Sequence, residues 1–132
     1  MSAEDVDIVR RIYLEWEMGD FSSNAWADPE IEYSIPEPSG KVHRGVEEME
    51  RAWLNWFSEW EDLSIRLTGI RDLGDEVLTT HTFHGRGRGS GVPVDELPGA
   101  GIWTFRDGKV IRYRGYTSVN DALADAGIPP ED

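Results

Sequence analysis

The sequence has no cysteine, no long apolar run and few basic residues. Without cysteine the chain can form no disulfide, thiol nucleophile or thiolate metal site, which fits a reducing compartment. Only 13 Lys and Arg stand against 26 Asp and Glu, and the net charge of −13 repels phosphate backbones and anionic membranes. The acidic N-terminus lacks the basic and apolar segments of a signal peptide, and no membrane span is visible. We therefore expect a cytoplasmic protein without nucleic-acid or membrane partners.

Aromatic residues, in contrast, are plentiful. A hydrophobic content of 39%, an aromatic content of 11% and six Trp are too high for a disordered acidic chain. A chain of 132 residues is long enough to bury roughly two-thirds of the surface that it exposes when unfolded. No linker, internal repeat or low-complexity block divides it, so the sequence predicts a single domain over residues 1–132.

Helical periodicity marks the first half and the end of the chain. Apolar residues recur at helical spacing from Val6 to Trp16 and stop at Gly19. A short turn of helix is expected over residues 21–26, and Ser118 is positioned to cap a final helix. The strongest helical stripe is formed by Met49, Trp53, Trp56, Phe57 and Trp60.

Strand periodicity begins with strict alternation of apolar and polar residues over 30–35 and returns after Leu63. Turn-forming residues divide the second region into three or four strands, with breaks at Gly74-Asp75, Gly85 to Pro93, Pro98-Gly99 and Asp107-Gly108. The last break, Asp107-Gly108-Lys109, predicts a tight antiparallel hairpin in which Gly supplies a positive φ. Helices followed by a meander of strands predict an α+β fold with the helices segregated to one face.

Several short strings follow one another along nearly the whole chain. They are Met18-Gly19-Asp20, Trp26-Ala27-Asp28-Pro29, His43-Arg44-Gly45, His84 to Gly91, Trp103 to Lys109 and Asp121 to Gly127. In this order they resemble the nuclear transport factor 2-like superfamily, in particular its SnoaL-like branch. The resemblance implies a cone-shaped, curved antiparallel or mixed sheet wrapped around three to four helices, an apolar pocket inside, and a convex face that often forms a homodimer. Its members include ketosteroid isomerases, polyketide cyclases, epoxide hydrolases and proteins without catalysis, so the fold leaves the function open.

The resemblance also implies which residues face the pocket. Strand alternation places Val77, Thr79, His81 and Phe83 on one face, and similarity to the isomerases turns this face inward. The same comparison directs Gly101, Trp103, Phe105, Tyr113, Gly115 and Thr117 inward, and Arg112, Arg114 and Tyr116 outward.

The tyrosine and the two acids of the ketosteroid isomerases have no counterparts in this sequence. The corresponding positions carry Ile12, with Tyr13 one residue out of phase, then Ser34 or Ile35, and Gly101. The nearest acidic candidates are Asp28 and Glu32. These departures argue against the isomerase reaction by that set of residues.

His81 is then the first candidate for chemistry, since an imidazole on a cavity wall is able to act as a base or a hydrogen-bond donor. In a catalytic interpretation His81 exchanges a proton with a bound ketone or enol while Tyr33 or Tyr113 donates to its oxygen. In a structural interpretation, which has about equal weight, a neighbouring tyrosine or threonine simply binds His81. The candidate ligand-binding residues are Trp53, Trp56, Phe57, Trp60, Phe83, Trp103 and Thr117, although such aromatic stripes more often form core.

No metal or cofactor is expected, because His43, His81 and His84 show no ligand spacing. The Gly85 to Gly91 stretch is interpreted as a bulged strand, with Arg86 and Arg88 as solvated charges or as an anion site at the rim. Two functions stay open: an isomerase- or cyclase-type acid/base enzyme acting on a small apolar carbonyl compound, or a non-catalytic ligand-binding or dimerisation domain. A homodimer would bury Leu78, Ile102 and Val110 between subunits.

Overall fold

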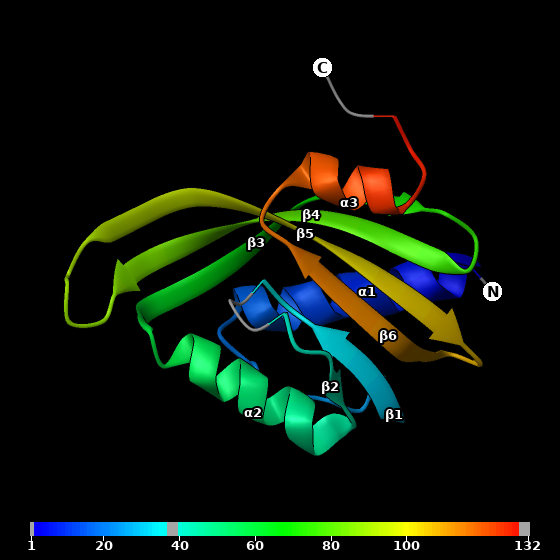
Figure 1. Cartoon of the computed structure of the whole chain (residues 1–132), viewed down its shortest axis with the longest axis horizontal. Coiled ribbons are helices and arrows are strands. Elements are labelled where there is room, and N and C mark those ends of the chain that lie inside the picture. Colours follow the sequence, from blue (N-terminus) through cyan, green and yellow to red (C-terminus); the bar gives the residue numbers. More distant parts are fainter. Residues whose placement is uncertain (1, 37–39, 130–132) are drawn as a thin grey trace.

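The computed structural model describes residues 2–36 and 40–129, and its central feature is one curved, six-stranded sheet (Figure 1). The strands are β1 (Ala27–Ser34), β2 (His43–Arg44), β3 (Trp60–Asp72), β4 (Glu76–Gly87), β5 (Pro93–Arg106) and β6 (Lys109–Tyr116). They lie in the order β2-β1-β6-β5-β4-β3. Strands β1 and β6 pair in parallel and the other neighbours pair antiparallel, so the sheet is mixed.

Helices cover both faces of this sheet. Helices α1 (Ser2–Glu17) and α2 (Val46–Phe57) lie on the concave side, with α1 against β3 and β4 and α2 against β1 and β2. The short helix α3 (Val119–Asp125) lies on the opposite face (Figure 1). The predicted α+β class and the mixed sheet around helices are confirmed, although α3 packs outside the curve. Among the described residues, no helix is both long and apolar enough to cross a membrane.

Strand alternation divides the buried residues into two clusters. The inner cluster, on the concave side, includes Val77 and Trp103, and the outer cluster, under α3, includes Leu78 and Ile102. The predicted inward face of β4 is therefore confirmed. Leu78, Ile102 and Val110 are 3%, 0% and 0% exposed within a single chain, so the prediction that they form a subunit interface is wrong. The homodimer itself stays a prediction, which the mass of the protein in solution tests.

Local turn and capping signals were interpreted correctly. Arg106 pairs with Lys109, and the turn between them has a positive φ at both Asp107 (53°) and Gly108 (78°). This is the backbone geometry that an Asp-Gly hairpin turn requires. Ser118 caps α3 by accepting a hydrogen bond from the Asp121 amide at 3.3 Å.

Three element boundaries differ from the prediction. Trp60 begins β3, opposite Gly87, instead of continuing α2. Residues 21–26 form no helix, because side chain to backbone bonds such as the Ser22 amide to Asp20 Oδ1 (3.0 Å) offer this segment an alternative. Pro98 does not break β5: strand β6 ends opposite Ala100, so β5 is an edge at Pro98, where a proline is tolerated.

The predicted bulge is present where the glycine-rich stretch begins, but the stretch is not all strand, because β4 ends at Gly87 and residues 88–90 form a turn. The pairing of β4 with β5 shifts between Phe83 and Gly85, and the pairing of β3 with β4 shifts between Glu61 and Ser64. A Cβ at Gly85 would lie 3.0 Å from the Glu61 carbonyl oxygen, so only glycine permits this close approach. The irregularities bend the long strands, and this bending gives the sheet its concave side.

Candidate functional site

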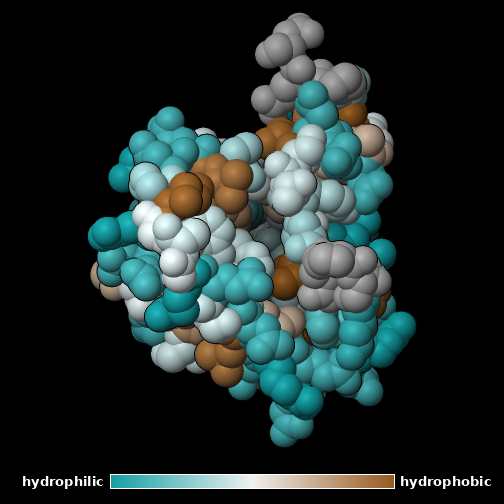
Figure 2. Space-filling model, turned by 60° about the vertical axis from the view of Figure 1, so that its left-hand side comes forward, coloured by the Kyte–Doolittle hydropathy of each residue, from teal (hydrophilic) through white to brown (hydrophobic). Residues whose placement is uncertain are grey.

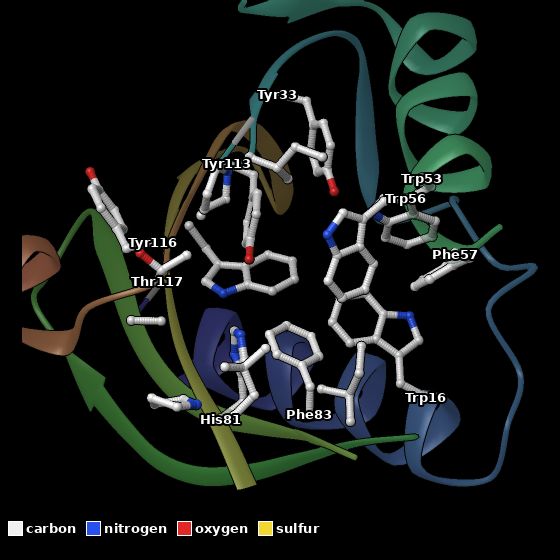
Figure 3. A pocket seen from close by; sticks show the side chains of 18 of the residues that line it. Trp16, Tyr33, Trp53, Trp56, Phe57, His81, Phe83, Tyr113, Tyr116 and Thr117 are labelled. Atoms are coloured by element: carbon white, nitrogen blue, oxygen red, sulfur yellow. The ribbon is translucent and has the colours of Figure 1, made fainter. Parts of the chain in front are cut away.

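A cavity of about 170 Å³ lies on the concave side of the sheet. All of the residues predicted for the site line it: His81, Tyr33, Tyr113, Trp53, Trp56, Phe57, Trp60, Phe83, Trp103 and Thr117. They come from β1, α2 and every later strand, with Thr117 just after β6, and Figure 3 shows their side chains around a common space. The space-filling view shows a face hollowed near its centre, with hydrophobic residues beside the hollow (Figure 2). The structure thus brings the predicted residues together, and their roles stay predictions.

The cavity wall carries no charged side chain among the residues that the structure describes. Asp28 and Glu32, the predicted nearest acids, do not reach it. Asp28 accepts a hydrogen bond from the Glu30 amide at 2.9 Å, and Glu32 lies 3.6 Å from Arg44. A charged ligand group would lose its hydration here without gaining a partner, so the wall suits a neutral molecule.

His81 lies in this wall and is only 5% exposed. Its Nδ1 is 2.7 Å from the hydroxyl oxygen of Tyr13. Burial lowers the pKa of His81 from 6.5 to about 4, because the charged imidazolium would be desolvated. The ring is therefore neutral at pH 7. Nε2 makes no hydrogen bond to any described residue.

Tyr13, which sequence comparison placed out of phase, is the partner that holds His81. It is 0% exposed, its hydroxyl also lies 2.9 Å from Thr79 Oγ1, and burial raises its pKa well above the usual value. This hydrogen bond agrees with the structural interpretation of the sequence, in which a tyrosine or threonine binds His81, but the sequence did not indicate which tyrosine. The spacing of Val9, Tyr13 and Trp16 in the apolar stripe was the signal that could have found it.

Tyr33 and Tyr113 stack on each other, with ring centroids 5.3 Å apart and an interplanar angle of 19°. Both hydroxyls point toward the cavity in Figure 3. The Tyr113 hydroxyl has no hydrogen-bond partner in the described part of the chain, and burial raises the pKa of Tyr113. A Cβ at Gly101 would lie 2.8 Å from this hydroxyl, so the Tyr113 ring occupies the space that a larger side chain at Gly101 would need.

Gly99 makes room for His81 in the same way. A Cβ at Gly99 would lie 2.6 Å from His81 Nε2 and 2.9 Å from Phe83 Cε2. Gly99 and Gly101 are alternate residues of β5, so they face the same side about 7 Å apart. The two glycines thus leave room on the concave side of β5 for the rings that line the cavity, the imidazole of His81 beside Gly99 and the phenol of Tyr113 beside Gly101.

The predicted aromatic residues divide into core and wall. Trp53 and Trp103 are 8% and 0% exposed and belong to the inner cluster. Trp56 and Trp60 are half-buried, and their rings lie 5.4 Å apart even though α2 has already ended between them. Trp56 also lies 4.9 Å from the ring of Phe83, and so closes one side of the cavity.

Tyr116, predicted to point outward, also lines the cavity. Its hydroxyl points away and donates to Asp125 of α3 at 2.5 Å. Burial and this hydrogen bond raise the pKa of Tyr116 to about 12. The phenol therefore contributes ring surface to the cavity and ties β6 to α3.

The other two histidines lie outside the cavity. His84 contacts Asp95 at 2.7 Å and Thr82 at 3.0 Å on the opposite face of β4. His43 is half-buried in β2 opposite Tyr33. The described residues contain no group of His, Asp and Glu that could hold a metal ion.

The arginines of the glycine-rich turn bind protein groups. Arg88 donates through Nε to the Ser58 carbonyl at 2.7 Å and through Nη2 to the Trp60 carbonyl at 3.1 Å. It thus holds the end of α2 against β4, which the sequence did not predict. Arg86 forms only an exposed ion pair with Asp62 at 3.3 Å.

Comparisons with known proteins agree with this geometry. Residues 9–113 match the model of the SnoaL-like domain family. A protein from Jannaschia sp. CCS1 described as a SnoaL-like polyketide cyclase is 21% identical, with a TM-score of 0.78 over 98% of this chain and 95% of that one. An NTF2-like protein from Burkholderia thailandensis E264 is 24% identical, with a TM-score of 0.75 over 95% and 98% of the two chains. TerC, co-crystallised with polyporic acid, is 17% identical, with a TM-score of 0.74 over 95% and 97%. At these identities the likenesses show the fold, and no curated protein matches the chain.

Proposed function

Since this chain belongs to the SnoaL-like domain family, we propose that it binds a small, neutral, largely apolar molecule inside the cavity. The cavity volume of about 170 Å³ is close to the ~150 Å³ of an engineered apolar cavity that holds benzene. The ligand would therefore have the size of one ring with short substituents. The aromatic walls favour a flat ring, and the uncharged lining favours a neutral one.

We propose further that this ligand carries a carbonyl or enol oxygen. The observation that supports this is the pair of polar groups in an otherwise aromatic wall, His81 Nε2 and the Tyr113 hydroxyl, neither of which bonds to a described residue. A purely hydrocarbon ligand would leave both groups buried and unsatisfied, at a cost of roughly 1–3 kcal/mol each. A ligand oxygen beside either group avoids that cost.

The binding proposal is tested by native mass spectrometry of the purified protein, followed by calorimetric titration with small aromatic ketones. Leu97 lines the cavity and is 41% exposed, so a Leu97→Trp variant should place an indole at the cavity and weaken binding without unfolding the chain. Val92→Trp is the matched control, because Val92 is 57% exposed and does not line the cavity. Equal affinities in the two variants would argue that binding occurs elsewhere.

A second candidate function is acid/base catalysis of the isomerase or cyclase type on the bound carbonyl compound. In this case His81 exchanges a proton with the ketone or enol, while Tyr33 or Tyr113 donates a hydrogen bond to the oxygen. The neutral imidazole in the cavity wall favours this function. We rank it below ligand binding without catalysis, because no carboxylate lies beside the imidazole. Incorporation of solvent deuterium next to the ketone carbonyl measures the reaction. An unchanged rate in His81→Gln would remove His81 from it.

A further inference from the structure

Hydrogen bonds connect the core to the cavity through four buried side chains. Trp103 Nε1 lies 3.0 Å from Thr79 Oγ1, Thr79 Oγ1 lies 2.9 Å from the Tyr13 hydroxyl, and that hydroxyl lies 2.7 Å from His81 Nδ1. Their exposed fractions do not exceed 5%. Solvent water therefore does not compete with these bonds, and the direction of each one follows from the donors present.

The first two bonds have one consistent direction. The indole N–H of Trp103 is only a donor, so Thr79 Oγ1 accepts from it. The hydrogen of Thr79 then has two acceptors within reach, the Gly101 carbonyl at 3.4 Å and the Tyr13 oxygen at 2.9 Å. The Tyr13 oxygen is the nearer of the two and lies within the usual range of about 2.5–3.0 Å for an O–H···O bond, so we assign the Thr79 hydrogen to Tyr13 and not to Gly101.

The last bond decides where His81 carries its proton. Because the Tyr13 oxygen accepts from Thr79, its own hydrogen is directed at His81 Nδ1, which becomes the acceptor. A neutral imidazole has one protonated nitrogen and one bare nitrogen. With Nδ1 bare, the proton lies on Nε2.

The surroundings of Nε2 leave this N–H free to meet a ligand. The His81 ring lines the cavity, whereas Tyr13 and Thr79, which hold the Nδ1 edge, do not. Gly99 lies beside Nε2, and any side chain at this position would collide with the ring edge, since its Cβ would be 2.6 Å from Nε2. Glycine therefore leaves room for Nε2, which makes no hydrogen bond to any described residue.

We propose that the hydrogen bonds from Trp103 through Thr79 and Tyr13 fix the proton of His81 on Nε2, and that the cavity therefore recognises a hydrogen-bond acceptor on its ligand. Tyr13 is a positioning residue, since it acts through His81. In the bound state the N–H donates to a carbonyl oxygen and polarises it, so in the proton exchange considered above His81 acts first as a donor, because Nε2 already carries a proton and cannot take one from carbon. The statement that the cavity recognises a hydrogen-bond acceptor rests on the proposed ligand binding, whereas the position of the His81 proton does not depend on it.

The position of the proton is measured in the ligand-free protein by nitrogen-15 NMR of the histidine side chains at pH 7. The wild type should show His81 protonated on Nε2 alone. Tyr13→Phe removes the donor to Nδ1 and should give a mixture of the two tautomers. Tyr113→Phe is the matched control: it removes a buried hydroxyl that does not contact His81, and should leave the tautomer unchanged. A wild-type proton on Nδ1 would overturn the inference without any variant being made.

Ligand preference is measured with acetophenone and its isostere α-methylstyrene, in which a CH₂ group replaces the carbonyl oxygen. The wild type should bind acetophenone about fivefold more tightly, the ratio expected for one net hydrogen bond. This preference should shrink in Tyr13→Phe. Equal affinities in the wild type would contradict recognition of an acceptor. If neither compound binds, the proposed function fails for this ligand class, and the NMR result still decides the position of the proton.

Discussion

Burial of a single imidazole makes the stability of this protein depend on pH. The pKa of His81 is lowered from 6.5 to about 4 in the folded chain by desolvation. Between these values the unfolded chain binds more protons, so stability rises with pH and is lost as pH falls from about 6.5 to 4. The loss attributable to His81 is on the order of 3 kcal/mol.

This prediction is checked by denaturant unfolding of the wild type and His81→Gln at several pH values between 7 and 4.5. The many carboxylates titrate in both proteins, so the difference between the two free energies of unfolding isolates the histidine. That difference should shrink as the pH falls. Parallel curves would show that His81 is not buried as the structure has it.

The close approach of His81 to Gly99 leads to a second prediction, for the stability of a glycine variant. Gly99→Ala places a Cβ 2.6 Å from His81 Nε2, so the ring must move, and we expect a loss of about 1–3 kcal/mol in the free energy of unfolding together with weaker ligand binding. Gly115→Ala is the control for stability alone, since its closest contact would be 3.3 Å, to Tyr113 Cε2, although Gly115 also lines the cavity. Thermal unfolding and ligand titration measure both. A control variant as unstable as Gly99→Ala would contradict the steric argument.

Sequence reasoning found the inward strand residues but missed Tyr13, and geometry explains the difference. Side chains on a strand alternate between two faces, so one reliable position assigns every other residue, as it did for His81. On a helix each residue turns the side chain by about 100°, so an alignment that is wrong by one residue assigns the wrong face. The hydrogen bonds from Tyr13 to β4 join positions 66 and 68 residues apart, and no local sequence pattern indicates them.

For helices and strands, features that depend on a few neighbouring residues are predicted correctly, whereas boundaries that depend on pairing with distant residues are not. The Asp107-Gly108 turn and the Ser118 cap each depend on only a few neighbouring residues, and the sequence predicts both. Trp60 was assigned to the preceding helix because its spacing from Trp56 is helical, but pairing with Gly87 places it in β3. The partner lies 27 residues away, so the competition between helix and strand is decided by tertiary contacts.

Arg88 provides a prediction for the junction of α2 with the sheet. It binds the carbonyl oxygens of Ser58 and Trp60, which follow the last turn of α2. Arg88→Met should lower the free energy of unfolding by about 1 kcal/mol, because these partly exposed bonds are lost. Arg86→Met, which removes only the exposed pair with Asp62, should change it by at most a few tenths of a kcal/mol. Denaturant unfolding compares the two; equal effects would mean that Arg88 does not hold the helix end.

For the whole molecule, the net charge of −13 opposes compaction through repulsion among excess carboxylates. Exposed ion pairs such as Arg44 with Glu32 contribute little, about 0–1 kcal/mol each, so salt should weaken repulsion more than attraction. We expect the melting temperature to rise by a few degrees between about 20 and 200 mM NaCl, where the Debye length falls to less than about 10 Å. Calorimetry measures this, and KCl should act equally. A falling melting temperature would show that ion pairs dominate.

Because β5 separates two packed regions, its small residues also protect the strand against sliding. Gly99 and Gly101 lie on the concave side against the rings of His81 and Tyr113, while Ala100 and Ile102 pack in the cluster under α3. A shift of β5 by one residue relative to its neighbouring strands would turn Ala100 and Ile102 toward the rings of His81 and Tyr113. It would also place glycines under α3, where no side chain would then fill the space. The same shift would remove both the cavity and the packing under α3. Misaligned pairing is therefore unfavourable on both sides of the sheet, and the cavity is formed as soon as β5 pairs in its correct register.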